Sequence, residues 1–132
     1  MKKILIIITS LFLAISLTCC DNKSAYKDGI YIGEGNMYSD GYDDVTVNVE
    51  RGKIVDIVIR HLDTNGKEIN YEEWTGENIN GKTNPNIQKY RTDTIKEVLA
   101  KQSADITIIN DINDISSNWK VAIADALEKA KK

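Results

Sequence analysis

The chain is poor in the residues that build disulfides, metal sites and catalytic triads. Its two cysteines, Cys19 and Cys20, are adjacent, so they cannot join distant segments of the chain. Its one histidine, His61, leaves little for a zinc site or a Ser-His-Asp triad, and we interpret it as a surface residue beside an incidental acid, Asp63. Its one phenylalanine, Phe12, lies in an N-terminal apolar run. We therefore predict no metal site, no catalytic centre, and a core made of Ile, Val, Leu, Tyr and Trp.

Positive charge is also in short supply. The chain has 17 Lys and Arg against 20 Asp and Glu, which gives a formal charge of −3 and a pI near 5.2. A nucleic-acid-binding protein would carry a basic surface, so we expect no nucleic-acid partner. With 132 residues, 42% of them hydrophobic and 28% charged, the composition is typical of one globular domain.

The N-terminus has the features of a bacterial lipoprotein signal. Lys2 and Lys3 precede an apolar run, residues 4–17, which is too short to span a bilayer comfortably but suits a signal peptide. The run ends in Leu17-Thr18-Cys19-Cys20, which is similar to a lipobox with Cys20 as the lipidated residue. We therefore expect a signal peptide over residues 1–19, a tether over 20–27 and a domain over 28–132. The protein would be lipid-anchored to the bacterial cell membrane on its extracytoplasmic face, the alternatives being plain secretion or an uncleaved anchor.

Two short apolar runs predict a β-hairpin. Val45, Val47 and Val49 alternate with polar residues, and residues 53–60 are rich in Ile and Val. Arg51-Gly52 between them predicts the turn. Upstream, glycines interrupt a β-like stretch that begins at Tyr31, which favours a bent edge strand.

The C-terminal half predicts two helices. One starts near Pro85 and places Ile87, Tyr90, Ile95, Val98 and Leu99 on one face. The other is capped by Ser116 or Ser117, and the run 106–109 between the two helices predicts a short buried strand. The second helix has one apolar stripe, made of Trp119, Ala122, Ile123, Ala126, Leu127 and Ala130. The fold class is therefore α+β, a small antiparallel sheet with a central β-hairpin and two helices packed on it.

The connection over residues 62–84 is polar and contains two turn signals, Asn65-Gly66 and Asn80-Gly81. The stretch from Asp63 to Glu73 is similar to an EF-hand calcium loop, but it is one residue too short and follows a predicted strand instead of a helix. We interpret it as an Asn-Gly turn.

Several short segments occur in an order that identifies a family resemblance. They are the opening segment 28–35, Gly52-Lys53-Ile54 at the hairpin turn, Thr83-Asn84-Pro85, the segment 102–105, and Ala126-Leu127. In their order and spacing, from Asp28 to Ala130, the chain resembles the FMN-binding domain family. That family includes the flavin-carrying subunits of sodium-pumping quinone reductases and Rnf complexes, and small lipoproteins of extracellular electron transfer.

The resemblance implies FMN as the cofactor but not the family's covalent bond. In the family, the Thr of a Ser-Gly-Ala-Thr loop before the last helix is joined to the FMN phosphate. Here Asn110-Asp111-Ile112-Asn113 aligns with that loop, and the amide of Asn113 cannot form the phosphoester. Asp111 and Asp114 add negative charge, which opposes a phosphate by about 1 kcal/mol each. FMN is therefore expected to be non-covalent at the usual position, with Ser116 or Ser117 as substitute acceptors in the alternative.

The resemblance also implies a set of contacts for a bound FMN. The phosphate would lie on two serines and the backbone amides of the following helix, amide side chains would add polar contacts, and aromatic rings would pack on the isoalloxazine. Trp119 has the alternative role of a core residue. The candidate residues are Ser116 and Ser117 for the phosphate, Asn110 and Asn113 for the polar contacts, and Tyr38, Tyr42 and Trp119 for the ring.

Two functions remain open at this stage. One is an envelope-anchored FMN-binding lipoprotein that takes part in flavin-linked electron transfer with redox partner proteins. The other is a cofactor-free member of the family that acts as a binding or assembly lipoprotein. In both, the protein is a non-catalytic carrier or binding module.

Overall fold

Two strands joined by a tight turn form the centre of the structure, a computed structural model that describes residues 25–132. Strand β2 (Tyr42–Glu50) pairs antiparallel with β3 (Lys53–Leu62), and Val45 lies opposite Ile59. Arg51 and Gly52 have φ angles of 52° and 73°, as expected of a type I′ hairpin turn. The predicted hairpin is confirmed. The predicted signal peptide, the predicted lipobox and the start of the predicted tether lie outside the described residues.

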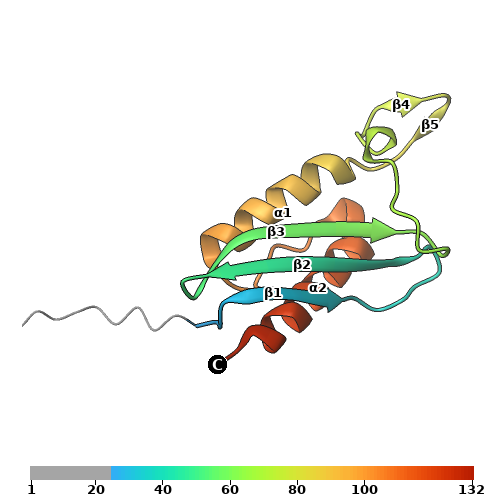
Figure 1. Ribbon diagram of the computed structural model, residues 1–132. Coiled ribbons are helices and arrows are strands. Elements are labelled where there is room, and N and C mark those ends of the chain that lie inside the picture. Colours follow the sequence, from blue (N-terminus) through green and yellow to red (C-terminus); the bar gives the residue numbers. More distant parts are fainter. Residues whose placement is uncertain (1–24) are drawn as a thin grey trace, which may run out of the picture.

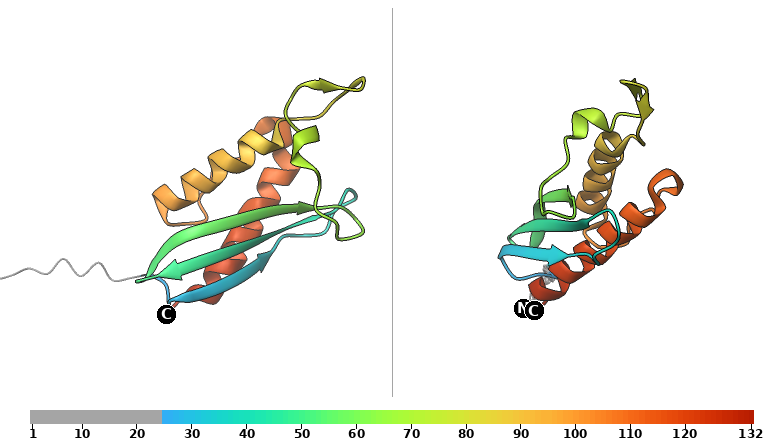
Figure 2. Two further views of the ribbon diagram at one scale, coloured as in Figure 1. Left: turned by 45° about the horizontal axis from the view of Figure 1, so that its top comes forward. Right: turned by 90° about the vertical axis from the view of Figure 1, so that its right-hand side faces the viewer.

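Strand β1 (Gly29–Glu34) completes the sheet as an edge strand on the other side of β2, so the order is β1-β2-β3 (Figure 1). Helices α1 (Ile87–Lys101) and α2 (Asn113–Ala130) cover one face of this sheet, α1 beside β3 and α2 across β1 and β2 (Figure 2). The described residues thus form an α+β fold of the predicted kind. None of their helices is long and apolar enough to cross a bilayer.

The core lies between the sheet and the helices. The inward face of the hairpin and the apolar stripe of α2 are buried against each other, which confirms both predicted patterns. Gly33 lets α2 approach β1 closely, because a Cβ at this position would lie 1.9 Å from the carbonyl oxygen of Ala122. The buried positions are Val45, Val47, Val49, Ile54, Ile57 and Ile59 on the hairpin, and Trp119, Ala122, Ile123, Ala126, Leu127 and Ala130 on α2.

The predicted strand over residues 106–109 is wrong. This segment is irregular, and side chains of the two helices bind its backbone in place of a neighbouring strand. The carboxylate of Glu97 accepts the N–H of Thr107, and the hydroxyl of Ser116 accepts the N–H of Ile109 at 2.9 Å. With these donors satisfied, the segment needs no strand partner.

The predicted serine cap of the last helix is also wrong. A 3-10 helix, η2 (Asn110–Ile112), leads directly into α2, which begins at Asn113 without a side-chain cap. Ser116 and Ser117 therefore lie inside the helix. The hydroxyl of Ser116 is fully buried and is used to hold Ile109, as described above.

The long connection carries three small elements: a 3-10 helix η1 (Tyr71–Glu73) and the strands β4 (Asn78–Ile79) and β5 (Lys82–Thr83). Asn80-Gly81 turns between β4 and β5 with positive φ at both residues, as predicted from the Asn-Gly pair. At the other end of the chain, the N–H of Lys27 donates to the carbonyl of Ala130 at 2.8 Å. The expected tether therefore already contacts the domain at Lys27.

Candidate functional site

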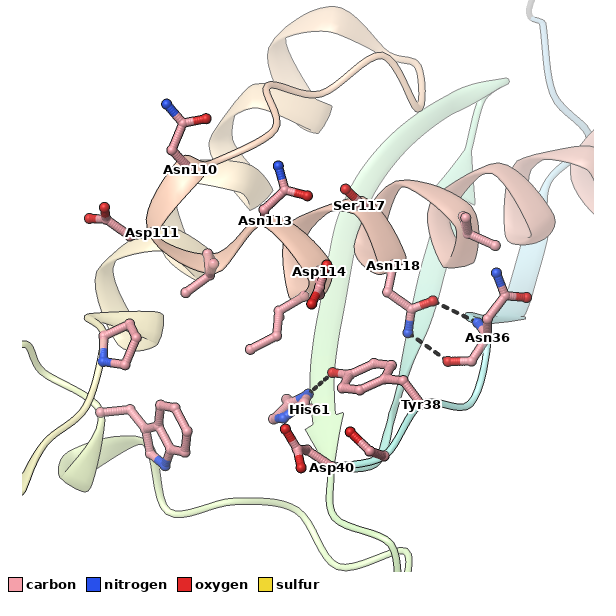
Figure 3. Close-up of a pocket in the computed structure, with 16 residues that line it drawn as sticks. Asn36, Tyr38, Asp40, His61, Asn110, Asp111, Asn113, Asp114, Ser117 and Asn118 are labelled. Atoms are coloured by element: carbon pink, nitrogen blue, oxygen red, sulfur yellow. Dashed lines mark hydrogen bonds between the residues drawn. The ribbon is translucent and has the colours of Figure 1, made fainter.

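A pocket of about 650 Å³ lies where the start of α2 faces the loop between β1 and β2 (Figure 3). Its walls come from segments that are far apart in the sequence, so only the folded chain forms it. The lining residues are Asn36, Tyr38, Ser39 and Asp40 of the β1–β2 loop, His61 of β3, Trp74 and Pro85 of the connection, and Asn110, Asp111, Ile112, Asn113, Asp114, Ile115, Ser117, Asn118 and Val121 of η2 and α2.

A buried carboxylate, that of Asp43, organises the floor of this pocket. Asp43 lies on β2 and is 0% exposed. Its Oδ1 accepts from Nδ1 of His61 at 2.7 Å and from the indole N–H of Trp119 at 3.1 Å. Its Oδ2 accepts from the hydroxyl of Tyr38 at 3.0 Å and from Nδ2 of Asn118 at 2.7 Å. Four donors thus offset the cost of burying the charge.

His61 is part of this floor and is not a surface residue, so its sequence interpretation is wrong. Its partner is Asp43, which lies directly opposite on β2, and not Asp63. The residue is only 4% exposed. The ring stacks on Tyr38, with centroids 5.9 Å apart, and meets Trp74 edge-on at 6.5 Å.

The orientation of His61 leaves one ring nitrogen for the pocket. Nδ1 faces Asp43 and Tyr38, and no described residue makes a hydrogen bond to Nε2. A proton on Nδ1 suits the carboxylate of Asp43, and it makes Nε2 a hydrogen-bond acceptor in the neutral ring. The lining of the pocket therefore contains an oriented acceptor.

Asn118 fixes the loop that forms the opposite wall. Its Oδ1 accepts the N–H of Asn36 at 2.6 Å, and its Nδ2 donates to the carbonyl of Asn36 at 2.9 Å (Figure 3). Gly35 beside it has no space for a side chain, because a Cβ there would lie 2.6 Å from the Asn118 amide. The β1–β2 loop is thus held against α2 by one side chain.

The rim of the pocket is negatively charged. Asp40, Asp111 and Asp114 belong to the lining, and among the described lining residues none is Lys or Arg. Burial, and then the negative charges of Asp43, Asp40 and Asp114, raise the pKa of the Tyr38 hydroxyl above its ordinary value. The hydroxyl of Tyr90 donates to Asp111, and this bond raises the pKa of Tyr90. Tyr38 therefore remains a neutral donor.

The structure brings together only part of the predicted cofactor site. Asn110, Asn113 and Ser117 line the pocket, as does Tyr38. However, the side chains of Asn110 and Asn113 point away from the pair formed by Tyr38 and His61 (Figure 3).

The other three predicted residues lie elsewhere. Ser116 is buried and bound to Ile109, and Trp119 is a fully buried core residue, which was its alternative role. Tyr42 lies on β2 opposite Leu62 and is not part of the lining. The sequence interpretation missed Asp43 and His61, although their alternation with the buried valines and isoleucines of each strand was a usable signal.

The lining residues suit one part of FMN, the cofactor that the family resemblance implies, and not another. Tyr38, His61 and Trp74, with the apolar Ile115 and Val121, suit a planar ring. The phosphate finds carboxylates and no cationic side chain among the described lining residues. Asp111 of η2 and Asp114 in the first turn of α2 already place negative charge at the N-terminus of the helix. The helix dipole therefore attracts an added phosphate less strongly. The lining therefore suits the isoalloxazine ring of FMN but not its phosphate.

No family model matches the chain, and no curated protein matches it. Among solved structures, the chain is similar to the CPE2226 protein from Clostridium perfringens, with a TM-score of 0.63 and 22% identity over 80% of this chain and 88% of that one. It is also similar to a protein from Clostridium thermocellum, with a TM-score of 0.54 and 20% identity over 80% of this chain and 93% of that one. At these identities the likeness shows a shared fold and nothing further.

Proposed function

We propose that this protein is an envelope-anchored lipoprotein that binds a flavin non-covalently and takes part in flavin-linked electron transfer. The observation that carries the proposal is the pocket of about 650 Å³ between the β1–β2 loop and the start of α2, with Tyr38, His61 and Trp74 in its lining. Aromatic walls with a few oriented polar groups are typical of sites for planar organic ligands. The family resemblance supplies the flavin as the ligand class.

Each of these residues has a distinct role in the proposed site. Tyr38 and Trp74 would offer contact area to the ring, and both are kept in place through His61. Asp43 would hold the imidazole of His61 in one orientation. When bound, a flavin would supply reversible electron transfer, which none of the described side chains provides.

A covalent flavin is not part of the proposal. Asn113 cannot form a phosphoester, and Ser116 has a buried hydroxyl bound to the backbone of Ile109. Ser117 lines the pocket but lies inside α2.

A second candidate function is favoured by the charge of the rim. Three carboxylates without a lining Lys or Arg among the described residues also suit a cofactor-free lipoprotein that binds another neutral or cationic ligand. This is the alternative function left open by the sequence.

Flavin titration of the purified full-length chain distinguishes the two functions. We expect flavin fluorescence to be quenched on binding, and any colour of the protein to be lost from it on denaturation. Trp74→Leu should weaken binding at least about tenfold, whereas the matched variant Tyr42→Leu, outside the pocket, should leave it unchanged. A colourless chain that quenches neither riboflavin nor FMN would reject the flavin and favour the cofactor-free function.

The membrane anchor is tested separately by labelling cells with a radioactive fatty acid. Cys20→Ala should abolish the label and release the protein from membranes, because Cys20 occupies the lipidated position of the lipobox. Cys19→Ala is the matched control and should leave the fatty-acid label and the membrane attachment unchanged. Label retained in Cys20→Ala would contradict the lipobox assignment.

A further inference from the structure

Two carboxylates flank the aromatic part of the pocket from opposite sides. Figure 3 shows Asp114 of α2 above the pair formed by Tyr38 and His61, and Asp40 of the β1–β2 loop below it. Both contribute to the field that acts on the Tyr38 hydroxyl. Both are exposed, and neither makes a salt bridge with a described residue. Any ligand stacked on the aromatic residues therefore lies between two negative charges that no salt bridge with a described residue neutralises.

The buried side of the pocket provides a second and independent constraint. His61 is only 4% exposed, and its Nε2 makes no hydrogen bond with a described residue. Nε2 is not among the fully buried unpaired side-chain atoms of the described residues, so water can reach it from the pocket, and a ligand N–H that displaces this water keeps the hydrogen bond. Because Nδ1 is held by Asp43 at 2.7 Å, the ring cannot turn over without breaking that bond.

We propose that the pocket selects a phosphate-free ligand with an N–H group that donates to Nε2 of His61; for a flavin, this ligand is riboflavin. The oxidised isoalloxazine ring has a single N–H, at N3, which is the matching donor. This inference rests on the proposed function and narrows its ligand class. It also reverses the expectation from the family resemblance, in which the phosphate is the attachment point.

The carboxylates of Asp40 and Asp114 should weaken the binding of a ligand that carries a phosphate. Two like unit charges a few ångströms apart in water repel each other by about 1 kcal/mol, which weakens binding about fivefold. The repulsion is larger where water is excluded. A phosphate dianion near Asp40 and Asp114 is therefore expected to bind at least about tenfold more weakly than an uncharged ribityl chain. The penalty is electrostatic, so it should shrink as salt screens it.

Comparative titration of the full-length chain tests the charge selection. Riboflavin should bind at least about tenfold tighter than FMN at low ionic strength, and the ratio should fall at high ionic strength. Asp114→Asn should lower the ratio of riboflavin affinity to FMN affinity several-fold. Asp56→Asn is the matched control, because this exposed residue of β3 changes the net charge equally but does not line the pocket. FMN binding as tightly as riboflavin would overturn the inference and leave the flavin function standing.

A change in the ligand tests His61 without risk to the fold. Riboflavin methylated at N3 lacks the N–H, so it should bind at least about tenfold more weakly than riboflavin. Equal binding of the two would overturn the role of His61. If neither riboflavin nor FMN binds, the proposed flavin function fails as well, and this result is distinct from a failure of selection alone.

Discussion

Replacing Asp43 by Asn tests whether this buried carboxylate organises the floor of the pocket. Each oxygen of Asp43 accepts two hydrogen bonds, Oδ1 from His61 and Trp119, and Oδ2 from Tyr38 and Asn118. Asn keeps the shape of the side chain but replaces one oxygen with an NH₂ group, which is itself a donor. In either orientation of the amide, two buried donors lose their acceptor.

The expected loss of stability follows from these two bonds. Hydrogen bonds to a charged group contribute about 1.5–3 kcal/mol each, so the loss of two by Asp43→Asn should lower the free energy of unfolding by about 3–6 kcal/mol. This is a large part of the total of about 5–15 kcal/mol that is typical of a domain of this size. Urea denaturation followed by tryptophan fluorescence and circular dichroism measures the change.

The matched control for this measurement is again Asp56→Asn. Asp56 is exposed on β3 and its side chain makes no hydrogen bond with a described residue, so its replacement should change the free energy of unfolding by less than about 0.5 kcal/mol. If Asp43→Asn also cost less than about 1 kcal/mol, the network would not have the energetic role assigned to it. Asp43→Asn should further weaken riboflavin binding, because one orientation of the amide leaves Nδ1 of His61 without its acceptor and the other leaves the hydroxyl of Tyr38 without it.

Two further predictions concern packing and pH. Gly33→Ala places a Cβ 1.9 Å from the carbonyl oxygen of Ala122, so it should lower the free energy of unfolding by at least about 3 kcal/mol. Gly81→Ala, where φ is +82° and no atom lies within 4 Å, should cost only about 1 kcal/mol, and equal losses would refute the close-packing argument. Burial, and a hydrogen bond to Glu68, raise the pKa of Tyr71 from 10.0 to about 12. The folded protein thus holds this proton more tightly than the unfolded chain does, and the resulting stability is complete below pH 10 and lost as pH rises towards 12. Unfolding free energies measured across this range should fall less steeply in Tyr71→Phe, and an unchanged slope would contradict the assignment.

The elements that could be predicted from the sequence are those with a strong local pattern. The alternation Val45, Val47, Val49 and the Arg51-Gly52 turn specify the hairpin, because a strand with one buried face has a period of two residues. The stripe of α2 follows in the same way from its helical period. The strand predicted over residues 106–109 is wrong because apolar content alone does not distinguish a strand from a loop that side chains hold in place.

The candidate site was less predictable because its members interact across the fold. Alignment with the family motif predicts Asn110 and Asn113 as contacts of a bound FMN, and Ser117 is predicted as a phosphate contact in the following helix; all three line the pocket. In the sequence the acidic neighbour of His61 is Asp63, whereas its hydrogen-bond partner in the fold, Asp43, is 18 residues away. Nothing near Asn118 in the sequence indicates that it binds Asn36 and Asp43.

The sequence by itself determined the hairpin, the two helices, the acidic balance and the expectation of a lipid anchor, because each depends on residues that are close together in the chain. Only the tertiary structure decided which polar groups share the pocket. The register of β2 against β3 places Asp43 opposite His61, and the packing of α2 on the sheet adds Asn118 and Trp119 to the same carboxylate. These are long-range hydrogen bonds, and their partners depend on how strands and helices pack and not on any local preference.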